Sequence, residues 1–234
     1  MDYNYVAAAE ALALIESNTR VFLHGSACTP LYLLQELTKE AHRLKNVEFV
    51  SISLQGQDLA FTQPEYKESF YINSLFVSAP VRNVVNNGQA DFVPIFLSDI
   101  PDLFNNKIYE LDTAIIHVSP PDKHGYCSLG TSIDIARSAI NNANKIIALV
   151  NPKMPRTHGD GLIHYTQIDK MVFHEAELPE VDYSAKMSDA DRQIGQHIAG
   201  LIEDRSTLQM GIGTIPDAVL NYLDNHKHLG IHTE

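Results

Sequence analysis

Short apolar runs alternate with segments of helical periodicity along most of the chain, and this pattern constrains the fold more than any other feature. Thr113–Val118 (TAIIHV) and Lys145–Val150 (KIIALV) are almost continuously apolar, as expected of strands buried on both faces. Apolar residues recur at helical spacing elsewhere, for example over Leu31–Leu44 and Ser188–Ile202. The alternation predicts an α/β fold with a mostly parallel sheet and helices on both faces.

The other elements are predicted from the same two patterns, apolar runs and helical spacing, and from turn residues. Further strands are expected at Arg20–His24, Val47–Leu54, Ser74–Ser78, Phe92–Phe96, Thr207–Met210 and Leu229–Thr233. Further helices are expected at Ala7–Ile15, Pro80–Asn87, Ser98–Asn105, Ser132–Asn142 and Ile215–Leu223. Ser98 and Ser188 are candidate N-caps, because a serine hydroxyl can accept a bond from a free amide of the first turn. Gln55–Tyr71 is expected to form a long loop or a short helix.

Domain organisation rests on a single dip in hydrophobic composition, between residues 175 and 187. We therefore expect an amino-terminal domain over residues 1–187 and the start of a second domain over residues 188–234. The last strand begins at Leu229, and the chain stops as soon as that strand has formed. This ending suggests that the sequence is part of a longer protein.

The charge balance narrows the classes of partner. The chain has 234 residues, 17 Lys and Arg against 29 Asp and Glu, and a net charge of −12. Nucleic-acid binding is not expected, because neutralisation of phosphates by basic residues supplies most of that affinity. A small anionic ligand stays open, because backbone amides can bind an anion without lysine or arginine.

The cysteines and the amino terminus indicate the compartment. Cys28 and Cys127 lie far apart and form no CxxC pair, which fits a reducing cytoplasm better than a disulfide framework. The residues that follow Met1 include no basic n-region of a signal peptide. No run approaches the ~18 apolar residues of a membrane span. We therefore expect a cytoplasmic protein that does not enter a membrane.

The segment from Gln209 to Pro216 (QMGIGTIP) is the sharpest local signal for a ligand site. It follows an apolar strand and opens a helix, with Pro216 in the first turn. Gly211 and Gly213 would let the backbone approach a ligand closely, and the free amides of a helix start favour an anion. Pro216 stands where a dinucleotide-binding motif needs its third glycine, and no GK[ST] follows as in a P-loop. A tight strand-to-helix turn without a ligand remains the alternative.

Glu234 follows the next strand, after the sequence Gly230–Thr233. Ligands of open α/β sheets bind beyond the carboxyl ends of the strands. A glutamate beside a glycine-rich helix start could therefore act as a nucleophile next to backbone amides. The alternative is a solvated terminal carboxylate.

The turn His24–Pro30 (HGSACTP) is a second strand-to-helix turn built from small residues. Cys28 could be a nucleophile at the helix start, or a small buried residue without chemistry. A serine hydrolase is not expected, because the chain contains no GxSxG elbow.

The eleven histidines raise the question of a metal site. His226, His228 and His232 fall on a helix end, a turn and a strand, and His174–Glu175 lacks the second histidine of HExxH. His158 and His164 flank a glycine-rich loop without a carboxylate at the usual spacing. No metal site is expected.

Four motifs taken together resemble the acetyl-CoA hydrolase/transferase family, most closely its 4-hydroxybutyrate and butyrate/acetate CoA-transferases. They are SPPDKHGYCSLG (119–130), VNPKMPRTHGDGLIH (150–164), GIGTIPDAV (211–219) and LGIHTE (229–234), in the family's order. The resemblance covers essentially the whole chain as the amino-terminal half. It implies a carboxyl-terminal half, absent here, that supplies further CoA contacts.

The resemblance also implies residue roles. Glu234 corresponds to the family's catalytic glutamate, which forms a glutamyl-CoA thioester in a ping-pong reaction. The CoA-contacting loop corresponds to Gly211, Ile212, Gly213, Thr214 and Ile215. Supporting positions are Gln209, Gly25, Ser26 and Gln55, while Arg156 and Asn151 could orient substrate or stabilise turns. Coenzyme A is the implied co-substrate, and a short-chain carboxylate such as 4-hydroxybutyrate, butyrate or acetate is the acceptor. The resemblance implies no other cofactor. A homo-oligomer is expected.

Two other functions stay open at this point. An acyl-CoA hydrolase of the same family would let water intercept the glutamyl intermediate. A non-catalytic fragment or interaction subunit, which needs a partner chain, would also fit the abrupt end at Glu234.

Overall fold

The structure is a computed structural model that describes residues 3–56, 59–180 and 187–232. Contacts within the chain divide it into two compact units, Met1–Pro179 and Glu180–Glu234. This division falls inside the compositional dip at residues 175–187, whereas the expected boundary was set at the end of that dip, between residues 187 and 188. Each unit is described by itself.

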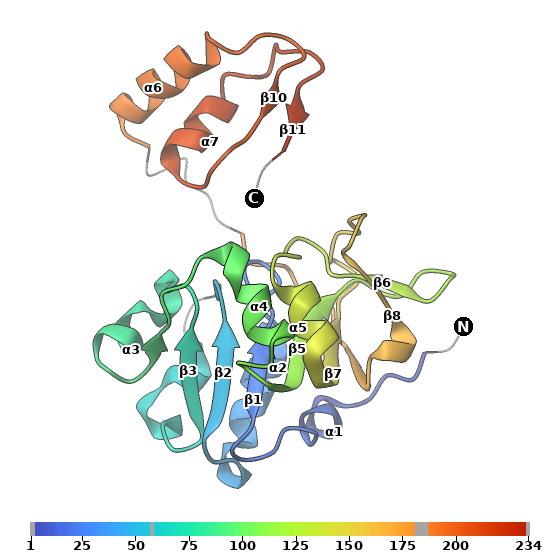
Figure 1. Cartoon of the computed structure of the whole chain (residues 1–234). Coiled ribbons are helices and arrows are strands. Elements are labelled where there is room, and N and C mark those ends of the chain that lie inside the picture. The colour runs from blue at the N-terminus through green and yellow to red at the C-terminus, as the bar shows by residue number, and fades with distance from the viewer. Residues whose placement is uncertain (1–2, 57–58, 181–186, 233–234) are drawn as a thin grey trace. The chain divides into compact units, whose positions relative to one another are not determined.

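A seven-stranded parallel sheet forms the centre of the first unit, in the order β4-β3-β2-β1-β5-β7-β9 (Figure 1). Its strands are β1 (Arg20–Leu23), β2 (Val47–Ser51), β3 (Phe70–Ser74), β4 (Asp91–Phe92), β5 (Leu111–Val118), β7 (Ala143–Val150) and β9 (Lys170–Phe173). The parallel sheet confirms the predicted fold class.

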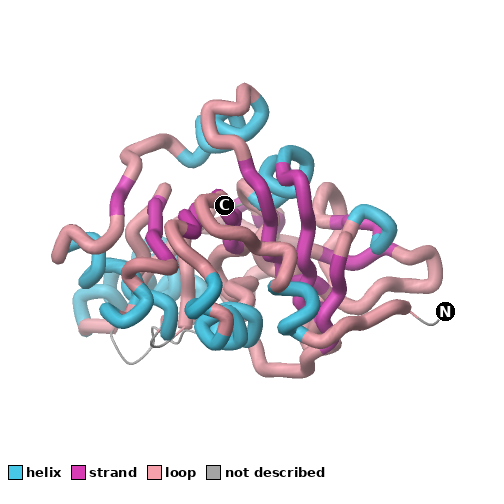
Figure 2. The backbone as a smooth tube through the Cα atoms, turned by 90° about the horizontal axis from the view of Figure 1, so that it is seen from below, coloured by secondary structure: helices cyan, strands magenta, loops and turns pink. Residues whose placement is uncertain are grey.

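Helices cover both faces of this sheet (Figure 2). The helices of the first unit are α1 (Ala8–Leu12), α2 (Leu31–Lys39), α3 (Arg82–Asn86), α4 (Ile100–Asn105) and α5 (Ala136–Asn142). Val21 and Leu23 of β1 pack in one apolar cluster with residues of α1 and α2, whereas Phe22 packs in a second cluster with residues of α4 and α5. Because successive side chains of a strand point to opposite faces, β1 contributes to both cores and reads as continuously apolar.

Two predicted elements of the first unit are wrong in position. The strand expected at Ser74–Ser78 is β3, Phe70–Ser74, which pairs with β2 from Val47↔Phe70 to Ser51↔Ser74. Phe70 and Ile72 enter the core from that register, and the local apolar pattern does not show which register is used. Ser98 does not cap α4, since its hydroxyl donates to Asp99 at 3.0 Å and the helix has no side-chain cap.

Several short elements lie outside the predicted set or differ from it. The stretch between β2 and β3 contains two 3-10 turns, Ala60–Thr62 and Pro64–Tyr66, rather than one helix. An antiparallel pair, β6 (Tyr126–Ser128) with β8 (Leu162–His164), joins two loops that follow β5 and β7. β6 and β8 are too short to stand out as periodic patterns, and β9 also lies outside the predicted set.

The second unit contains α6 (Asp189–Ala199), α7 (Thr214–Leu220) and a parallel pair, β10 (Thr207–Leu208) with β11 (Gly230–Ile231). The predicted cap at Ser188 is confirmed as a capping box: its hydroxyl accepts from the Asp191 amide at 3.2 Å, and the Asp191 carboxylate accepts from the Ser188 amide at 2.9 Å. Gly195 lets α6 approach α7, because a Cβ atom there would lie 2.7 Å from the Ala218 carbonyl carbon.

Candidate active site

The predicted site residues fall in both units of the chain. Gly25, Ser26 and Gln55 belong to the first unit, and the loop Gln209–Ile215 belongs to the second. Glu234, the predicted nucleophile, lies outside the described residues. The geometry below therefore concerns its neighbours in the chain, which end at His232.

Strands β10 and β11 run parallel and side by side, so their carboxyl ends lie at the same edge. Leu208 pairs with Ile231, and the His232 amide donates to the Leu208 carbonyl at 2.8 Å. The loop that begins at Gln209 and the segment that leads toward Glu234 consequently leave the sheet from neighbouring positions. The nucleophile itself, Glu234, stays a prediction.

The glycine loop, Gly211–Ile215, has open space beside both of its glycines. Gly213 is the N-cap of α7 with φ +123°, a backbone conformation in which an L side chain is strained. Gly211 has no such φ, and a Cβ atom at either glycine would meet no atom within 4 Å. Ile212 between them is 86% exposed. The glycines therefore leave space beside the backbone instead of relieving a tight packing contact.

A hollow of about 350 Å³ opens beside this loop, and its walls are mainly apolar. The apolar side chains that line it come from α6, β10, α7 and the residues that follow α6 and β10: Ile198, Ile202, Leu208, Met210, Ile215 and Val219. A larger hollow, of about 570 Å³, lies in the first unit beside Gly56 and Asn83, and none of the predicted site residues lines it. The hollow next to the glycine loop is the one that matches the sequence-based site.

In the first unit, Gly25, Ser26 and Gln55 are brought together at the carboxyl ends of β1 and β2. The Ser26 amide donates to the Ser53 carbonyl, and Thr29 Oγ1 donates to the Ser26 carbonyl at 2.8 Å and accepts from the Gln55 amide at 3.0 Å. Ser26 has φ +52°, which is uncommon for a residue with a side chain. Ser26 and Gln55 therefore share one hydrogen-bond network, next to Gly25, whereas the fourth predicted supporting residue, Gln209, lies in the second unit.

The cysteines have the environment of structural residues. Cys28 is fully buried, and its Sγ lies 3.4 Å from the Leu129 carbonyl oxygen and 3.2 Å from Thr131 Oγ1. Burial raises the pKa of the Cys28 thiol, and burial raises that of Cys127 to about 12. Both thiols stay protonated near neutral pH, so the reading of Cys28 as a small buried residue is the one that the structure supports.

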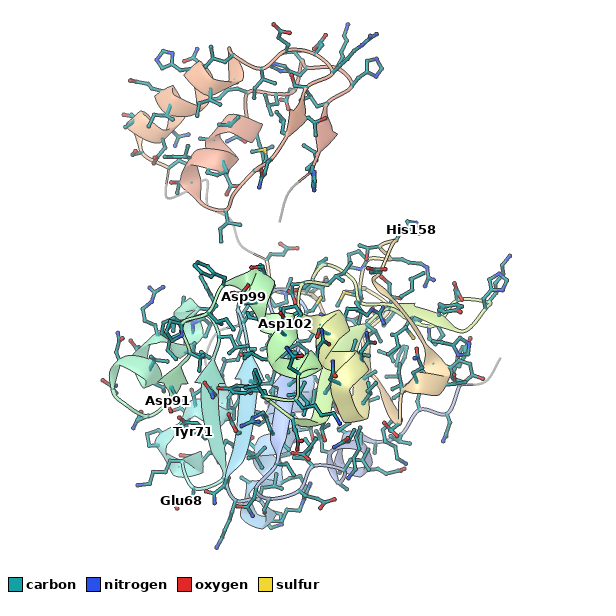
Figure 3. All side chains as sticks on the ribbon, viewed as in Figure 1. Glu68, Tyr71, Asp91, Asp99, Asp102 and His158 are labelled. Carbon is teal, nitrogen blue, oxygen red and sulfur yellow. The ribbon has the colours of Figure 1, made fainter. Side chains whose placement is uncertain are left out.

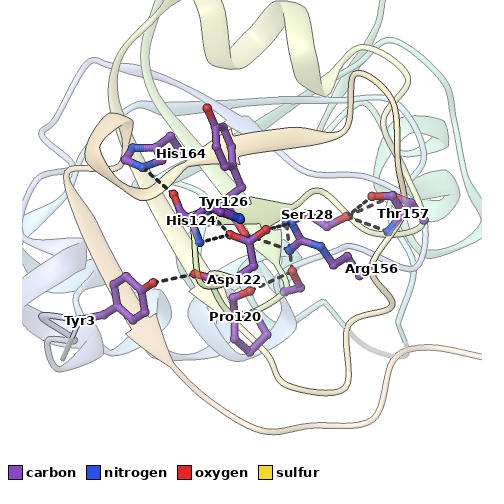
Figure 4. Close-up of polar contacts among 10 residues, drawn as sticks. Tyr3, Pro120, Asp122, His124, Tyr126, Ser128, Arg156, Thr157 and His164 are labelled. Atoms are coloured by element: carbon purple, nitrogen blue, oxygen red, sulfur yellow. Dashed lines mark hydrogen bonds and ion pairs between the residues drawn. The ribbon is translucent and has the colours of Figure 1, made fainter. Parts of the chain in front are cut away.

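The motifs at residues 119–130 and 150–164 contact one another (Figure 4). Arg156 forms an ion pair with Asp122 at 2.6 Å and donates to the Tyr126 carbonyl at 2.9 Å. The Asp122 carboxylate also accepts from the amides of His124 and Tyr126, at 2.8 and 3.0 Å, and the Tyr126 bond is the main cause that lowers the pKa of Asp122. Arg156 therefore stabilises a turn, in agreement with the structural alternative.

The side chain of Asn151 also makes hydrogen bonds that stabilise the backbone. Its side-chain amide donates to the Ala176 carbonyl at 2.7 Å, and its oxygen accepts from the Lys153 amide at 3.0 Å. The residue is fully buried. Its hydrogen bonds join the loop after β7 to the segment after β9.

Among the described residues, no group of three or more histidine, cysteine, aspartate or glutamate side chains could hold a metal ion. His164 bonds with Thr166 and with the His124 carbonyl, at 2.7 and 3.2 Å, and His158 lies on an exposed loop (Figure 3). Within the same residues, no helix has the length and hydropathy to cross a membrane.

Two buried histidines were not selected as site residues from the sequence. His24 follows β1 and His117 lies near the end of β5, and they are 0% and 4% exposed. The only signal was that each interrupts or ends an apolar run, which by itself does not distinguish a core histidine from a functional one.

Comparison with known proteins agrees with this description. Residues 2–181 match the acetyl-CoA hydrolase/transferase N-terminal domain. A succinyl-CoA:acetate/propanoyl-CoA:succinate CoA transferase of Fasciola hepatica is 43% identical over 96% of this chain and 47% of its own length. A 4-hydroxybutyrate coenzyme A transferase of Clostridium kluyveri is 42% identical over 98% of this chain and 53% of its own length.

Solved structures show the same correspondence. A 4-hydroxybutyrate CoA-transferase from Porphyromonas gingivalis superposes with a TM-score of 0.78 at 31% identity, over 99% of this chain and 54% of its own. RipA from Yersinia pestis superposes with a TM-score of 0.88 at 29% identity, over 98% and 56%. The chain spans about half the length of the curated relatives that it matches. It belongs to the acetyl-CoA hydrolase/transferase family.

Proposed function

We propose that the protein containing this chain is a CoA-transferase, which moves coenzyme A between an acyl-CoA and a free short-chain carboxylate. The observation that carries the proposal is the parallel pairing of β10 with β11, which puts the glycine loop and the segment before Glu234 at one sheet edge. The relatives named as CoA transferases support the reaction class. Acceptors such as 4-hydroxybutyrate, butyrate and acetate are the proposed substrates, in keeping with the names of those relatives and of a butyryl-CoA:acetate CoA-transferase.

In the proposed mechanism, the Glu234 carboxylate attacks the thioester carbonyl of the acyl-CoA. The C–S bond breaks, and CoA thiolate leaves as an acyl-glutamyl anhydride forms. The thiolate then attacks the glutamyl carbonyl and releases the first carboxylate, which leaves a glutamyl-CoA thioester. A second carboxylate reverses both steps. The thioester bond energy is conserved, so the reaction requires an acyl-CoA and a carboxylate acceptor, and no cofactor beyond coenzyme A.

The glycine loop has a defined part in this proposal. Gly211–Ile215 would contact CoA, because Gly211, Ile212 and Ile215 are exposed and both glycines leave open space beside the backbone. The adjoining apolar hollow would take an apolar part of the ligand. Gln209, exposed at the loop start, would be a polar partner of the reacting carboxylates. We also propose a cytoplasmic homo-oligomer, with further CoA contacts from a carboxyl-terminal half.

Trapping the intermediate tests the mechanism. Full-length protein incubated with acyl-CoA and then with borohydride should be reduced at Glu234 and lose activity, as found by peptide mass spectrometry. Glu234→Gln should remove the adduct, whereas Glu203→Gln, at an exposed glutamate of the same unit, should retain it. Full activity of Glu234→Gln would refute the assigned nucleophile.

Hydrolysis is the second candidate, because the matching family description includes acetyl-CoA hydrolases. Thiol release can be followed with and without added acetate. Release that requires the carboxylate acceptor supports transfer, whereas equal release without an acceptor would replace the transferase proposal by hydrolysis. Absence of both activities in the full-length protein would favour a non-catalytic role.

A further inference from the structure

In the sheet of the first unit, the order of the strands reverses between β1 and β5. Strands β2, β3 and β4 extend to one side of β1, and β5, β7 and β9 extend to the other. Open α/β sheets bind ligands outside the carboxyl ends of the strands at such a reversal. The turn Gly25–Cys28 follows β1 at this point, so its conformation matters for whatever binds there.

A second segment, Leu129–Asp134, is bonded to this turn through two side chains. His24 Nε2 lies 2.6 Å from the Ser132 carbonyl oxygen, and Cys28 Sγ lies 3.2 Å from Thr131 Oγ1. His24 and Cys28 are both 0% exposed. In the interior, a lost hydrogen bond leaves a polar group without water to replace the partner. The two contacts therefore hold the turn against the segment.

The hydrogen bonds of His24 determine its tautomer. The backbone amide of His117 donates to His24 Nδ1 at 3.1 Å, so Nδ1 must carry a lone pair. The proton of the neutral ring is then on Nε2, from which it is donated to the Ser132 carbonyl. A doubly protonated ring would direct an N–H group at the His117 amide. Only the neutral Nε2–H form satisfies both bonds.

We propose that His24 is a positioning residue, which as the neutral Nε2–H tautomer ties the Gly25–Ser26 turn to the end of β5 and to the segment Leu129–Asp134. The inference rests on the proposed function, for which the family resemblance implies a supporting role of Gly25 and Ser26. Ser26 needs such support, because its φ of +52° persists in a residue with a side chain only when the surroundings hold it.

The surroundings of His24 favour this neutral form. Burial lowers the pKa of His24, although the Ser132 carbonyl and the Asp134 carboxylate oppose the shift. The His117 side chain is a further titratable group beside it. The Asp134 carboxylate accepts from the Ser132 hydroxyl and from the Ile135 and Ala136 amides, so its charge is shared among these donors.

Nitrogen NMR tests the tautomer without any assay of activity. In uniformly ¹⁵N-labelled protein at pH 7, the His24 ring should give the shift pattern of a neutral imidazole protonated at Nε2. An Nδ1–H tautomer, or a doubly protonated ring, would overturn the proposal. This result does not depend on whether the protein transfers CoA.

Variants of His24 test the positioning role. His24→Asn places an amide near the His117 N–H, His24→Gln reaches toward the Ser132 carbonyl, and His24→Leu keeps neither bond. His24→Leu should speed amide hydrogen exchange of His117 and Ser26 at least tenfold, and His24→Asn should restore slow exchange at His117. His42→Leu, an exposed histidine after α2, is the matched control. Unchanged exchange in His24→Leu would refute the role, and the Asn and Gln variants decide if the Leu variant does not fold.

Activity of the full-length enzyme supplies a separate readout. His24→Leu should lower kcat/KM for acyl-CoA at least tenfold, and His24→Asn or His24→Gln should recover part of the loss. Equal losses in all three variants would contradict positioning through the two bonds. An inactive wild-type protein would instead refute the proposed function, while NMR and hydrogen exchange would still decide the role of His24.

Discussion

Replacing His117 with phenylalanine should make the protein less sensitive to acid. The His117 side chain is 4% exposed, and neither ring nitrogen has a hydrogen-bond partner among the described residues. Burial, followed by the nearby His24, lowers the pKa of His117 from 6.5 to about 4. The folded state therefore resists protonation of this ring, whereas the unfolded chain accepts the proton readily.

The pKa difference sets the size and direction of the effect. Because the folded-state pKa is the lower one, the unfolded state binds more protons, and stability falls as the pH decreases from about 6.5 to about 4. One pKa unit corresponds to ~1.36 kcal/mol, so the shift amounts to about 3 kcal/mol when complete, and to about 2 kcal/mol at pH 5. Above pH 7, His117→Phe should be neutral or slightly stabilising, because it removes two buried nitrogens without partners.

Urea unfolding followed by circular dichroism at pH 7.5 and pH 5 measures this effect. The loss of unfolding free energy between the two pH values should be smaller in His117→Phe than in the wild type by about 2 kcal/mol. His117→Leu provides a second non-titrating side chain, and His42→Phe, at an exposed position, should retain the wild-type loss. An equal pH dependence of the wild type and both His117 variants would refute the reasoning.

Two further predictions concern glycines. A Cβ atom at Gly211 would meet no atom within 4 Å, so Gly211→Val should leave the melting temperature of the full-length protein unchanged while weakening CoA binding in calorimetry, whereas Gly213→Val, at φ +123°, should lower both. An undiminished affinity of Gly211→Val would contradict the CoA-loop assignment. Gly130→Ala should lower the unfolding free energy more than Gly88→Ala, because both have similar positive φ but only the former methyl group overlaps Met154. The backbone strain alone costs about 1–3 kcal/mol, and equal losses in the two variants would show that Met154 moves aside freely.

The elements predicted most accurately are those specified by local interactions. Strands β5 and β7 are buried on both faces and therefore appear as continuous apolar runs. The N-cap of α6 is Ser188, which bonds with Asp191 only three residues later. β3 was misplaced because its position is set by pairing with β2, and β9 was missed although it is as long as β1. Register depends on the partner strand, which local periodicity does not identify.

The candidate site divides in a similar way. A glycine-rich strand-to-helix turn at Gly211 and Gly213 was predictable, because glycine adopts the backbone conformations of tight turns that residues with a side chain avoid. The pairing of β10 with β11 involves residues that are more than twenty positions apart, and only the folded unit brings them together. Arg156 and Asn151 could not be assigned from their residue types, since their partners Asp122 and Ala176 also lie at a distance in the chain. Glu234 stays a prediction from the resemblance.

The sequence by itself determined the α/β class, the motifs of the family and the glycine turn, because each depends on residues close together in the chain. Only the tertiary structure decided the states of His24 and His117. His24 bonds to Ser132 and to the His117 amide across separations of 108 and 93 residues, and His117 is left without a partner in the described interior. A histidine ring takes its tautomer and its pKa from the groups around it, and the fold alone assembles those groups.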